Sequence, residues 1–153
     1  MLPILNKDCI VTDVSAAEKN DIIREMAGCL DRAGYLSDVE QFYQDVLERE
    51  KVFSTYIGYQ IGLPHGKSGG VNEAGLCIAK LPEEILWDEE SGEKVSLIIM
   101  IAVQAETDNN LHLQILSKLS RLLIHDDFRD DLRSGDKNGI YELIQTNLKE
   151  FDK

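Results

Sequence analysis

The stretch Val95-Ser96-Leu97-Ile98-Ile99-Met100-Ile101-Ala102-Val103 decides the fold of this chain, because it is the longest apolar run and only Ser96 interrupts it. A strand with one solvated face alternates polar and apolar residues, whereas a strand covered on both faces is almost continuously apolar. The run is about half as long as a bilayer-spanning helix requires. It therefore predicts a central strand with structure packed on both sides.

The residues before this run predict the other parts of a sheet. Aromatic, branched and glycine residues between Phe53 and Leu63 are typical of strand and turn, and Leu76–Leu81 predicts a further strand. The stretch Glu83–Glu93 holds six acids and Trp87, and we interpret it as a solvated connection. Its last four residues, Glu90–Glu93, predict a turn into the central strand.

Two helices are predicted ahead of the sheet, each beginning at a capping box. Ser15-Ala16-Ala17-Glu18 precedes apolar residues at helical spacing, and Gly34 marks the end of that helix. Ser37-Asp38-Val39-Glu40 begins the second helix, which we expect to end near Glu50. This end point places Arg49 in the last helical turn.

The chain after Val103 is predicted to be helical to its end. Candidate caps at Asp108, Asn109 and Asn110 precede a helix whose apolar positions are Leu111, Ile115, Leu116, Leu119, Leu122 and Leu123. Asp126 or Asp127 caps a short helix that ends at Ser134-Gly135, and Asp136 begins the last helix. We therefore expect an α/β fold over residues 1–153: a single domain with a mixed β-sheet flanked by helices.

Charge and cysteine content limit the classes of partner and the compartment. With 16 basic and 28 acidic residues, the formal net charge is -12, which argues against binding to nucleic acid or to an anionic membrane. Such a charge favours encounter with a basic protein. Cys9, Cys29 and Cys77 are scattered and suit reduced thiols in the cytoplasm. The start of the chain lacks the pattern of a secretory signal, so we expect no direct membrane insertion.

His65 lies in the segment Gly62-Leu63-Pro64-His65-Gly66-Lys67-Ser68-Gly69-Gly70. Proline before the imidazole restricts the backbone, and glycine after it permits close approach of another molecule. Lys67, Ser68 and the amides that follow His65 are candidate anion donors, although the spacing of a P-loop is absent. A surface turn with an incidental histidine is the alternative interpretation.

The other two histidines have simpler interpretations. His112 lies on the apolar side of its helix in the first turn, where the helix dipole and burial favour a neutral imidazole. Taken alone, it is interpreted as a core histidine with a satisfied hydrogen bond. His125 is predicted in the last turn of the same helix, as a partner for the dipole, and is given no function.

Other catalytic classes find little support in the sequence. A metal site that used His65 and His112 would have to recruit Asp108, Glu73 or Glu106 without a recognisable spacing. The serine-hydrolase elbow and the signatures of cysteine hydrolases are missing. The paired carboxylates of Asp88, Glu89 and Glu90 lie in an exposed acidic turn, which would not raise a pKa for acid catalysis.

Read together, the residues from Glu50 to Gly66 resemble the active-site signature of phosphotransferase-system (PTS) EIIA domains of the mannitol/fructose class, EIIA type-2. The correspondence comprises Glu50, Ile57-Gly58 and Ile61-Gly62-Leu63-Pro64-His65-Gly66. Gly62 stands where the family prefers alanine, and we expect it to add backbone freedom beside the histidine. Further similarities, in chain order, extend from about Ser15 to Leu148: Arg49-Glu50, Trp87, Gly92, Val95, His112-Leu113-Gln114-Ile115-Leu116 and Phe128–Leu132.

This resemblance implies a phosphotransferase component with a phosphohistidine intermediate. His65 would accept the phosphoryl group from the histidine-containing phosphocarrier protein HPr and pass it to a cysteine of an EIIB domain, which serves a sugar permease. Arg49 and His112 would stabilise the phosphoryl group, and the amides of Gly66 and Lys67 would bind its oxygens. No cofactor or metal is implied, because the donor is itself a phosphohistidine.

Two questions stay open at the level of sequence. A regulatory EIIA homologue of the nitrogen type, whose phosphorylation state controls partner proteins, would carry the same His65 site. The chain is expected to be a stand-alone EIIA protein or an excised domain. The net charge would have a role in either case if acids flanking the His65 face attract a basic phosphocarrier surface.

Overall fold

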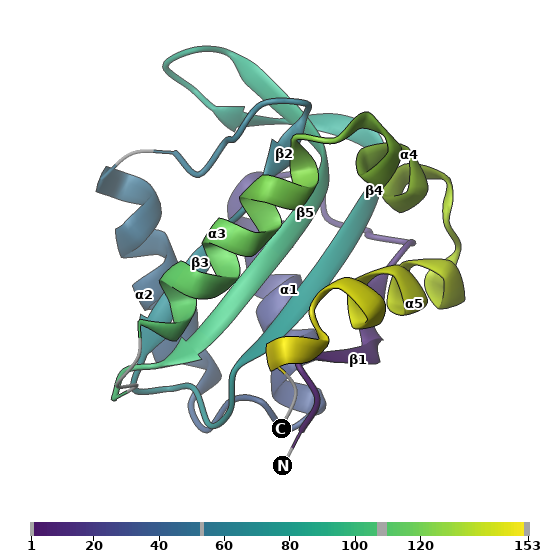
Figure 1. Ribbon diagram of the computed structural model, residues 1–153. Coiled ribbons are helices and arrows are strands. Elements are labelled where there is room, and N and C mark those ends of the chain that lie inside the picture. Colours follow the sequence, from purple (N-terminus) through teal and green to yellow (C-terminus); the bar gives the residue numbers. More distant parts are fainter. Residues whose placement is uncertain (1, 53, 107–109, 152–153) are drawn as a thin grey trace.

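The computed structural model describes residues 2–52, 54–106 and 110–151, and it shows a mixed sheet between two layers of helices (Figure 1). The strands are β1 (Leu5–Val11), β2 (Ile61–Gly62), β3 (His65–Ser68), β4 (Gly75–Asp88) and β5 (Glu93–Gln104). The helices are α1 (Lys19–Arg32), α2 (Val39–Val52), α3 (Leu111–Leu123), α4 (Asp126–Ser134), α5 (Lys137–Asn147) and the short 3-10 helix η1 (Lys149–Phe151). The predicted α/β class with a mixed, helix-flanked sheet is confirmed.

Strand β5 is the central strand of the sheet, as the apolar run predicts. The strand order is β1-β4-β5-β2, and β3 also pairs with β5. Strand β4 is antiparallel to β5, whereas β2 and β3 run parallel to β5 and follow one another along the same edge, opposite Leu97–Ile98 and Ile101–Gln104. Residues Leu97 to Val103 are at most 1% exposed, because helices cover both faces of this strand.

The two helical layers come from the two ends of the chain. Helices α1 and α2 pack on the face of the sheet that lies behind it in Figure 1, and α3, α4 and α5 cross the front. Helix α2 contacts β3, and α3 contacts β5. The two helices therefore approach the same edge of the sheet from opposite faces, at the start of β3.

The helix boundaries differ from several predictions. Helix α1 begins at Lys19 with Glu18 as its N-cap, so the predicted capping box at Ser15 is wrong; the Ser15 hydroxyl instead donates to Glu25 Oε1 at 3.4 Å. Asp38 caps α2 by accepting from the Gln41 amide. Asp136 caps α5 through the Gly139 amide, as predicted. Asn110 precedes α3 in a left-handed conformation without a side-chain cap, and the candidate caps Asp108 and Asn109 lie outside the described residues.

Three strand segments were not expected from the sequence. Strand β1 was missed because Asn6-Lys7-Asp8 places polar residues in its middle, at the point where its register with β4 is irregular. The residues Glu83–Asp88 continue β4 instead of forming a loop, and the hairpin turns at Glu89–Gly92. The segment after Pro64 is strand β3, so the interpretation of His65 as part of a surface turn is wrong.

The three cysteines are buried free thiols, and Cys77 is a core residue of β4. Within the described part of the chain, no helix is both long enough and apolar enough to span a bilayer.

Candidate active site

His65 begins β3, at the break between the two short strands that share the edge of β5. Pro64 lies in this break, and its carbonyl accepts a hydrogen bond from the Ile101 amide at 3.0 Å. This hydrogen bond holds the backbone between β2 and β3 to the central strand β5. The position of the imidazole is therefore fixed relative to the most buried part of the sheet. The side chain of His65 is half-buried.

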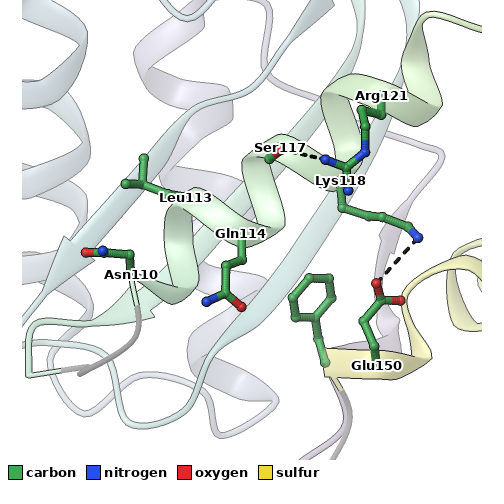
Figure 2. A pocket seen from close by; sticks show the side chains of 8 residues that line it. Asn110, Leu113, Gln114, Ser117, Lys118, Arg121 and Glu150 are labelled. Carbon is green, nitrogen blue, oxygen red and sulfur yellow. Dashed lines mark hydrogen bonds and ion pairs between the residues drawn. The ribbon is translucent and has the colours of Figure 1, made fainter.

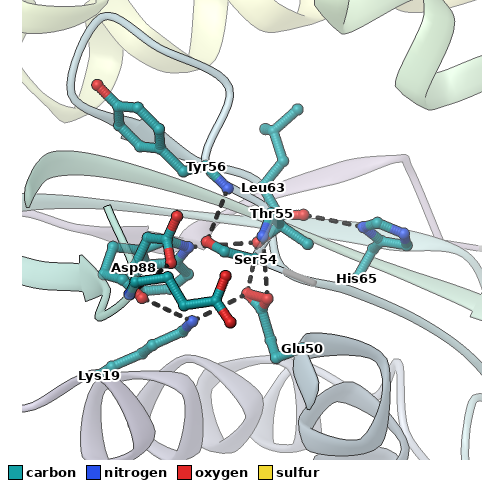
Figure 3. Close-up of polar contacts among 10 residues, drawn as sticks. Lys19, Glu50, Ser54, Thr55, Tyr56, Leu63, His65 and Asp88 are labelled. Carbon is teal, nitrogen blue, oxygen red and sulfur yellow. Dashed lines mark hydrogen bonds and ion pairs between the residues drawn. The ribbon is translucent and has the colours of Figure 1, made fainter. Parts of the chain in front are cut away.

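The imidazole of His65 has a defined orientation. Its Nδ1 lies 2.9 Å from the carbonyl oxygen of Leu63, two residues earlier in the chain (Figure 3). A backbone carbonyl only accepts hydrogen bonds, so Nδ1 carries the proton and donates it. In the neutral ring, this leaves the lone pair on Nε2. The local geometry therefore presents one nucleophilic nitrogen.

The surroundings of His65 favour the neutral ring. Burial lowers the pKa of His65, and the positive charge of Arg49 acts in the same direction, whereas the hydrogen bond to Leu63 and the charge of Glu50 oppose it. The net effect is a pKa below the ordinary value of 6.5. A neutral imidazole with its lone pair on Nε2 is the form in which histidine attacks an electrophile.

His112 lies in the first turn of α3 and faces the same region. Its pKa is also lowered, chiefly by burial and further by the nearby charges of Lys67 and His65. Its Nδ1 is buried and has no hydrogen-bond partner in the described part of the chain. The interpretation of His112 as a core histidine with a satisfied hydrogen bond is therefore wrong.

Arg49 lies in the last turn of α2, as predicted, and its charge acts on His65. The approach of α2 to β3 is close: a Cβ atom at Gly66 would lie 3.0 Å from Phe42 Cε1 and 3.0 Å from Val46 Cγ2. Glycine at this position thus lets α2, and Arg49 with it, come near His65.

The two predicted amide donors differ in direction. In a parallel ladder, successive residues direct their amides to opposite sides of the strand. Because His65 pairs with Ile101 and the Ile101 amide donates to Pro64, the Gly66 amide faces β5. The Lys67 amide faces the other side of β3, where the described residues provide no strand partner, and the Lys67 side chain is exposed.

A polar network lies behind the histidine, around the side chain of Glu50 (Figure 3). Thr55 donates both its backbone amide and its hydroxyl to the Glu50 carboxylate, and Lys19 Nζ lies 3.6 Å from Glu50 Oε1. The indole Nε1 of Trp87 donates to Thr55 Oγ1 at 3.3 Å. Glu50 and Trp87 are among the residues that carry the resemblance to EIIA domains. No spacing in the sequence, however, indicated that they belong to one hydrogen-bond network or that Thr55 and Lys19 are part of it.

The remaining candidates do not gather at His65. His125 precedes α4 and is its N-cap residue, so its predicted place in the last turn of α3 is wrong. Asp126 and Asp127 lie inside α4. No group of three or more histidine, cysteine or acidic residues within the described ranges has an arrangement that could hold a metal ion. A cavity of about 550 Å³ lies between η1 and the side of α3 opposite His112, and Figure 2 shows the ion pair of Lys118 and Glu150 at its rim.

Comparison with known proteins places this arrangement in a family. Residues 3–147 match the family model described as "Phosphoenolpyruvate-dependent sugar phosphotransferase system, EIIA 2". The chain belongs to this family. As an EIIA chain of type 2, it is a phosphotransferase component, and the resemblance noted from the sequence is confirmed.

The relatives of this EIIA chain include parts of larger proteins. The fructose-specific EIIABC component of the PTS in Bacillus subtilis (strain 168) is 32% identical over 147 residues, which are 95% of this chain and 23% of that protein. The chain thus spans less than a quarter of the length of this relative.

Solved structures of about the same length share the fold. The nitrogen regulatory protein IIA-Ntr of Neisseria meningitidis has 28% identity and a TM-score of 0.80, over 92% of this chain and 96% of that one. The mannitol enzyme IIA of Escherichia coli, in its complex with phosphorylated enzyme IIB, has 26% identity and a TM-score of 0.77, over 92% and 96%.

Proposed function

We propose that this protein carries a phosphoryl group on Nε2 of His65, accepting it from HPr and passing it to a cysteine of an EIIB component for sugar uptake. The observation that carries the proposal is the hydrogen bond between His65 Nδ1 and the Leu63 carbonyl, because it leaves the lone pair on Nε2. The lowered pKa of His65 supports it, since burial keeps the ring neutral.

The proposed reaction consists of two transfers. In each, one bond to phosphorus forms while the bond on the opposite side of the phosphorus atom breaks. The Nε2 lone pair forms a bond to phosphorus while the P–N bond of the donor phosphohistidine breaks and its electron pair returns to the donor ring. In the second step, a cysteine thiolate attacks phosphorus and the electron pair of the P–Nε2 bond returns to His65. Such a transfer depends on alignment and charge stabilisation and needs little covalent participation by the protein.

The neighbours of His65 have matching roles in this proposal. Arg49 offers a planar fork of donors to the phosphoryl oxygens, and His112 donates to them or orients them. The lowered pKa of His112 supports a neutral, hydrogen-bonding ring. The Lys67 amide and ammonium add donors on the open side of β3. Gly66 contributes chiefly by admitting α2, because its amide faces β5.

The EIIB partner is supported by the solved complex of the mannitol enzyme IIA with phosphorylated enzyme IIB. HPr as donor and the cytoplasm as the compartment are parts of the same proposal, and the three free thiols are consistent with that compartment. We also propose that residues 1–153 act as one EIIA unit, since a single hydrophobic core joins residues from β1 to the helix before η1.

A second candidate is the regulatory function, in which the phosphorylation state of the protein controls a partner. It is favoured by the similarity to the nitrogen regulatory protein of Neisseria meningitidis. The two candidates share the His65 chemistry and differ in the acceptor. Rapid transfer of labelled phosphate to an EIIB cysteine would support the sugar pathway, and failure with every candidate EIIB would support regulation.

The test is phosphorylation by phosphoenolpyruvate, enzyme I and HPr, followed by mass spectrometry. We expect one acid-labile phosphate, located on His65, and no labelling of His65→Ala. Arg49→Ala and His112→Ala should fold normally and accept phosphate roughly 10- to 100-fold more slowly, because each removes a donor to a charged group.

Two matched variants serve as controls. Arg24→Ala removes an exposed arginine that pairs with Glu40, and His125→Ala removes an exposed histidine. Both should accept phosphate at the wild-type rate. Equal labelling of His65→Ala and the wild type would contradict the proposed nucleophile, and wild-type rates in both Arg49→Ala and His112→Ala would contradict the proposed anion site.

A further inference from the structure

The carbonyl of Leu63 decides which nitrogen of His65 is free, so whatever holds Leu63 also controls the nucleophile. The Leu63 amide donates to the Thr55 carbonyl at 3.1 Å, and Tyr56 bridges to Gly62 in the same antiparallel pairing. The segment that follows α2 is therefore the backbone support of the residues before His65.

Thr55 is in turn held by a single carboxylate. Its amide lies 3.1 Å from Glu50 Oε2, and its hydroxyl donates to Glu50 Oε1. The Glu50 side chain is only 6% exposed, and the ammonium of Lys19 balances its charge. A buried carboxylate with these partners has little freedom to move, because each displacement would leave a charged or polar group unpaired.

Trp87, in strand β4, is the third residue that holds Thr55 in place. Its indole is 1% exposed, and Nε1 donates to the Thr55 hydroxyl, which thus accepts from Trp87 while donating to Glu50. Lys19 Nζ donates to the Trp87 carbonyl at 2.9 Å and lies 4.6 Å from the centre of its ring. The connection from Trp87 to His65 is continuous: Trp87, Thr55, Leu63, His65.

Gly62 makes room for this indole. A Cβ atom at position 62 would lie 2.7 Å from Trp87 Cε2 and 3.0 Å from Cζ2 and Nε1. These distances are shorter than van der Waals contact, and the indole lacks a flexible end that could move aside. Glycine in place of the family's alanine at position 62 therefore permits close packing against Trp87. This packing explains the glycine without the added backbone freedom that we expected from the sequence.

We propose that Trp87 and Thr55 are positioning residues for His65. Because Gly62 has no side chain, the indole of Trp87 can come close enough to Thr55 to donate its hydrogen bond. Trp87 and Thr55 act through the Leu63 carbonyl, which they hold against Nδ1, and so keep the lone pair on Nε2. The inference rests on the proposed function of His65, and it adds the means by which the nucleophilic nitrogen is selected.

The experiment measures the tautomer of His65 and the rate of phosphate acceptance in parallel. Long-range ¹H–¹⁵N spectra of the labelled protein report which ring nitrogen carries the proton. In the wild type we expect Nδ1–H. Thr55→Val removes the shared hydroxyl and keeps the shape, so we expect a mixture of tautomers and acceptance about 3- to 10-fold slower, the effect of one lost hydrogen bond.

Gly62→Ala should give the same two changes by displacing the indole. Combining it with Trp87→Leu, which removes the colliding ring, should leave a protein no slower than Trp87→Leu alone. A merely additive loss in the double variant would contradict the proposed contact. Thr146→Val on the exposed side of α5 and Gly69→Ala, where the added Cβ meets open space, are the matched controls. Both should retain the wild-type tautomer and rate.

The outcomes separate the inference from the proposed function. If His65 accepts phosphate but Thr55→Val and Gly62→Ala keep the wild-type tautomer and rate, the positioning role is wrong and the proposed function stands. If His65 accepts no phosphate, the proposed function fails, and the spectra still show whether Thr55 and Gly62 select the tautomer. Thermal unfolding of each variant identifies any that lose activity by failing to fold.

Discussion

At the scale of single residues, the reactivity of His65 follows from its surroundings. Burial lowers its pKa, and the Arg49 guanidinium, a donor proposed for the phosphoryl group, lowers it further. The same arginine would therefore serve in both states of the reaction: it favours the neutral ring before transfer and offsets the phosphoryl charge afterwards.

The lowered pKa of His65 predicts a pH dependence of stability and of reactivity. In the unfolded chain the ring takes up a proton near pH 6.5, whereas the folded protein resists protonation until the pH falls further. Stability should therefore decline as the pH falls through 6.5 toward the folded pKa, and phosphate acceptance should persist below pH 6.5. Denaturant unfolding and an NMR titration of the ring measure the two effects.

His65→Gln should reduce the loss of stability over this pH range, because it removes one of the groups that take up a proton on unfolding. His112, whose pKa is also lowered, still contributes to the remaining loss. A titration midpoint for His65 above 6.5 would contradict the environment described here.

At the scale of elements, the turn before β2 stores backbone strain. Gly58, Tyr59 and Gln60 have φ angles of 96°, 57° and 62° in succession, in the left-handed region. Helix α4 holds this turn: the Arg129 guanidinium lies 3.7 Å from the centre of the Tyr59 ring, and Arg133 donates to the Tyr59 carbonyl. Such conformations persist where surrounding contacts fix them, and this one connects the Thr55 support to β2.

Gly58→Ala should destabilise the protein by about 1 kcal/mol, because a Cβ is unfavourable at a left-handed φ. The added atom meets no neighbour within 4 Å, so the effect isolates the backbone cost. Urea unfolding measures it against Gly69→Ala, which has open space and no left-handed φ. Equal stability of the two variants would show that the turn relaxes without cost.

At the scale of the whole molecule, exposed acids are spread over several elements. The charges that act on His65 and His112 belong to Arg49, Glu50 and Lys67, and Glu50 is buried beside Lys19. Exposed acids are found on α2, at the β4–β5 hairpin and on α4, including Glu48, Glu89, Glu90, Asp126 and Asp127. Glu89 and Glu90 line the same cavity as Glu50. Attraction of a basic partner would therefore draw on acids over the whole surface, which together give the net charge of -12.

Phosphate transfer from HPr should slow as salt is added, by about an order of magnitude between 0.05 and 0.5 M, because screening shortens the range of this attraction. The second-order rate constant measures the effect. A Glu89→Gln, Glu90→Gln double variant should reduce the slope without changing the tautomer of His65. A rate that is independent of salt would mean that the net charge serves solubility alone.

Much of the fold was accessible from local patterns. The apolar run identified β5, glycine marked the end of α1, and Asp136 marked the start of α5. The two strand segments that the sequence analysis missed also have local explanations. Strand β1 carries three polar residues where its pairing is irregular, and the acids after Glu83 lie on a strand that extends beyond the covered part of the sheet. In both places, pairing with a neighbouring strand outweighs the preferences of the side chains.

The sequence by itself determined the central strand, the helices on either side of it, and the Pro-His-Gly segment in which His65 lies, since these depend on residues close together in the chain. Only the tertiary structure decided that His112 faces His65, that Thr55 joins Glu50 to Leu63, and that Trp87 fills the space left by Gly62. Most of these contacts join segments far apart in sequence, and all depend on side-chain directions that are fixed only when the layers pack together.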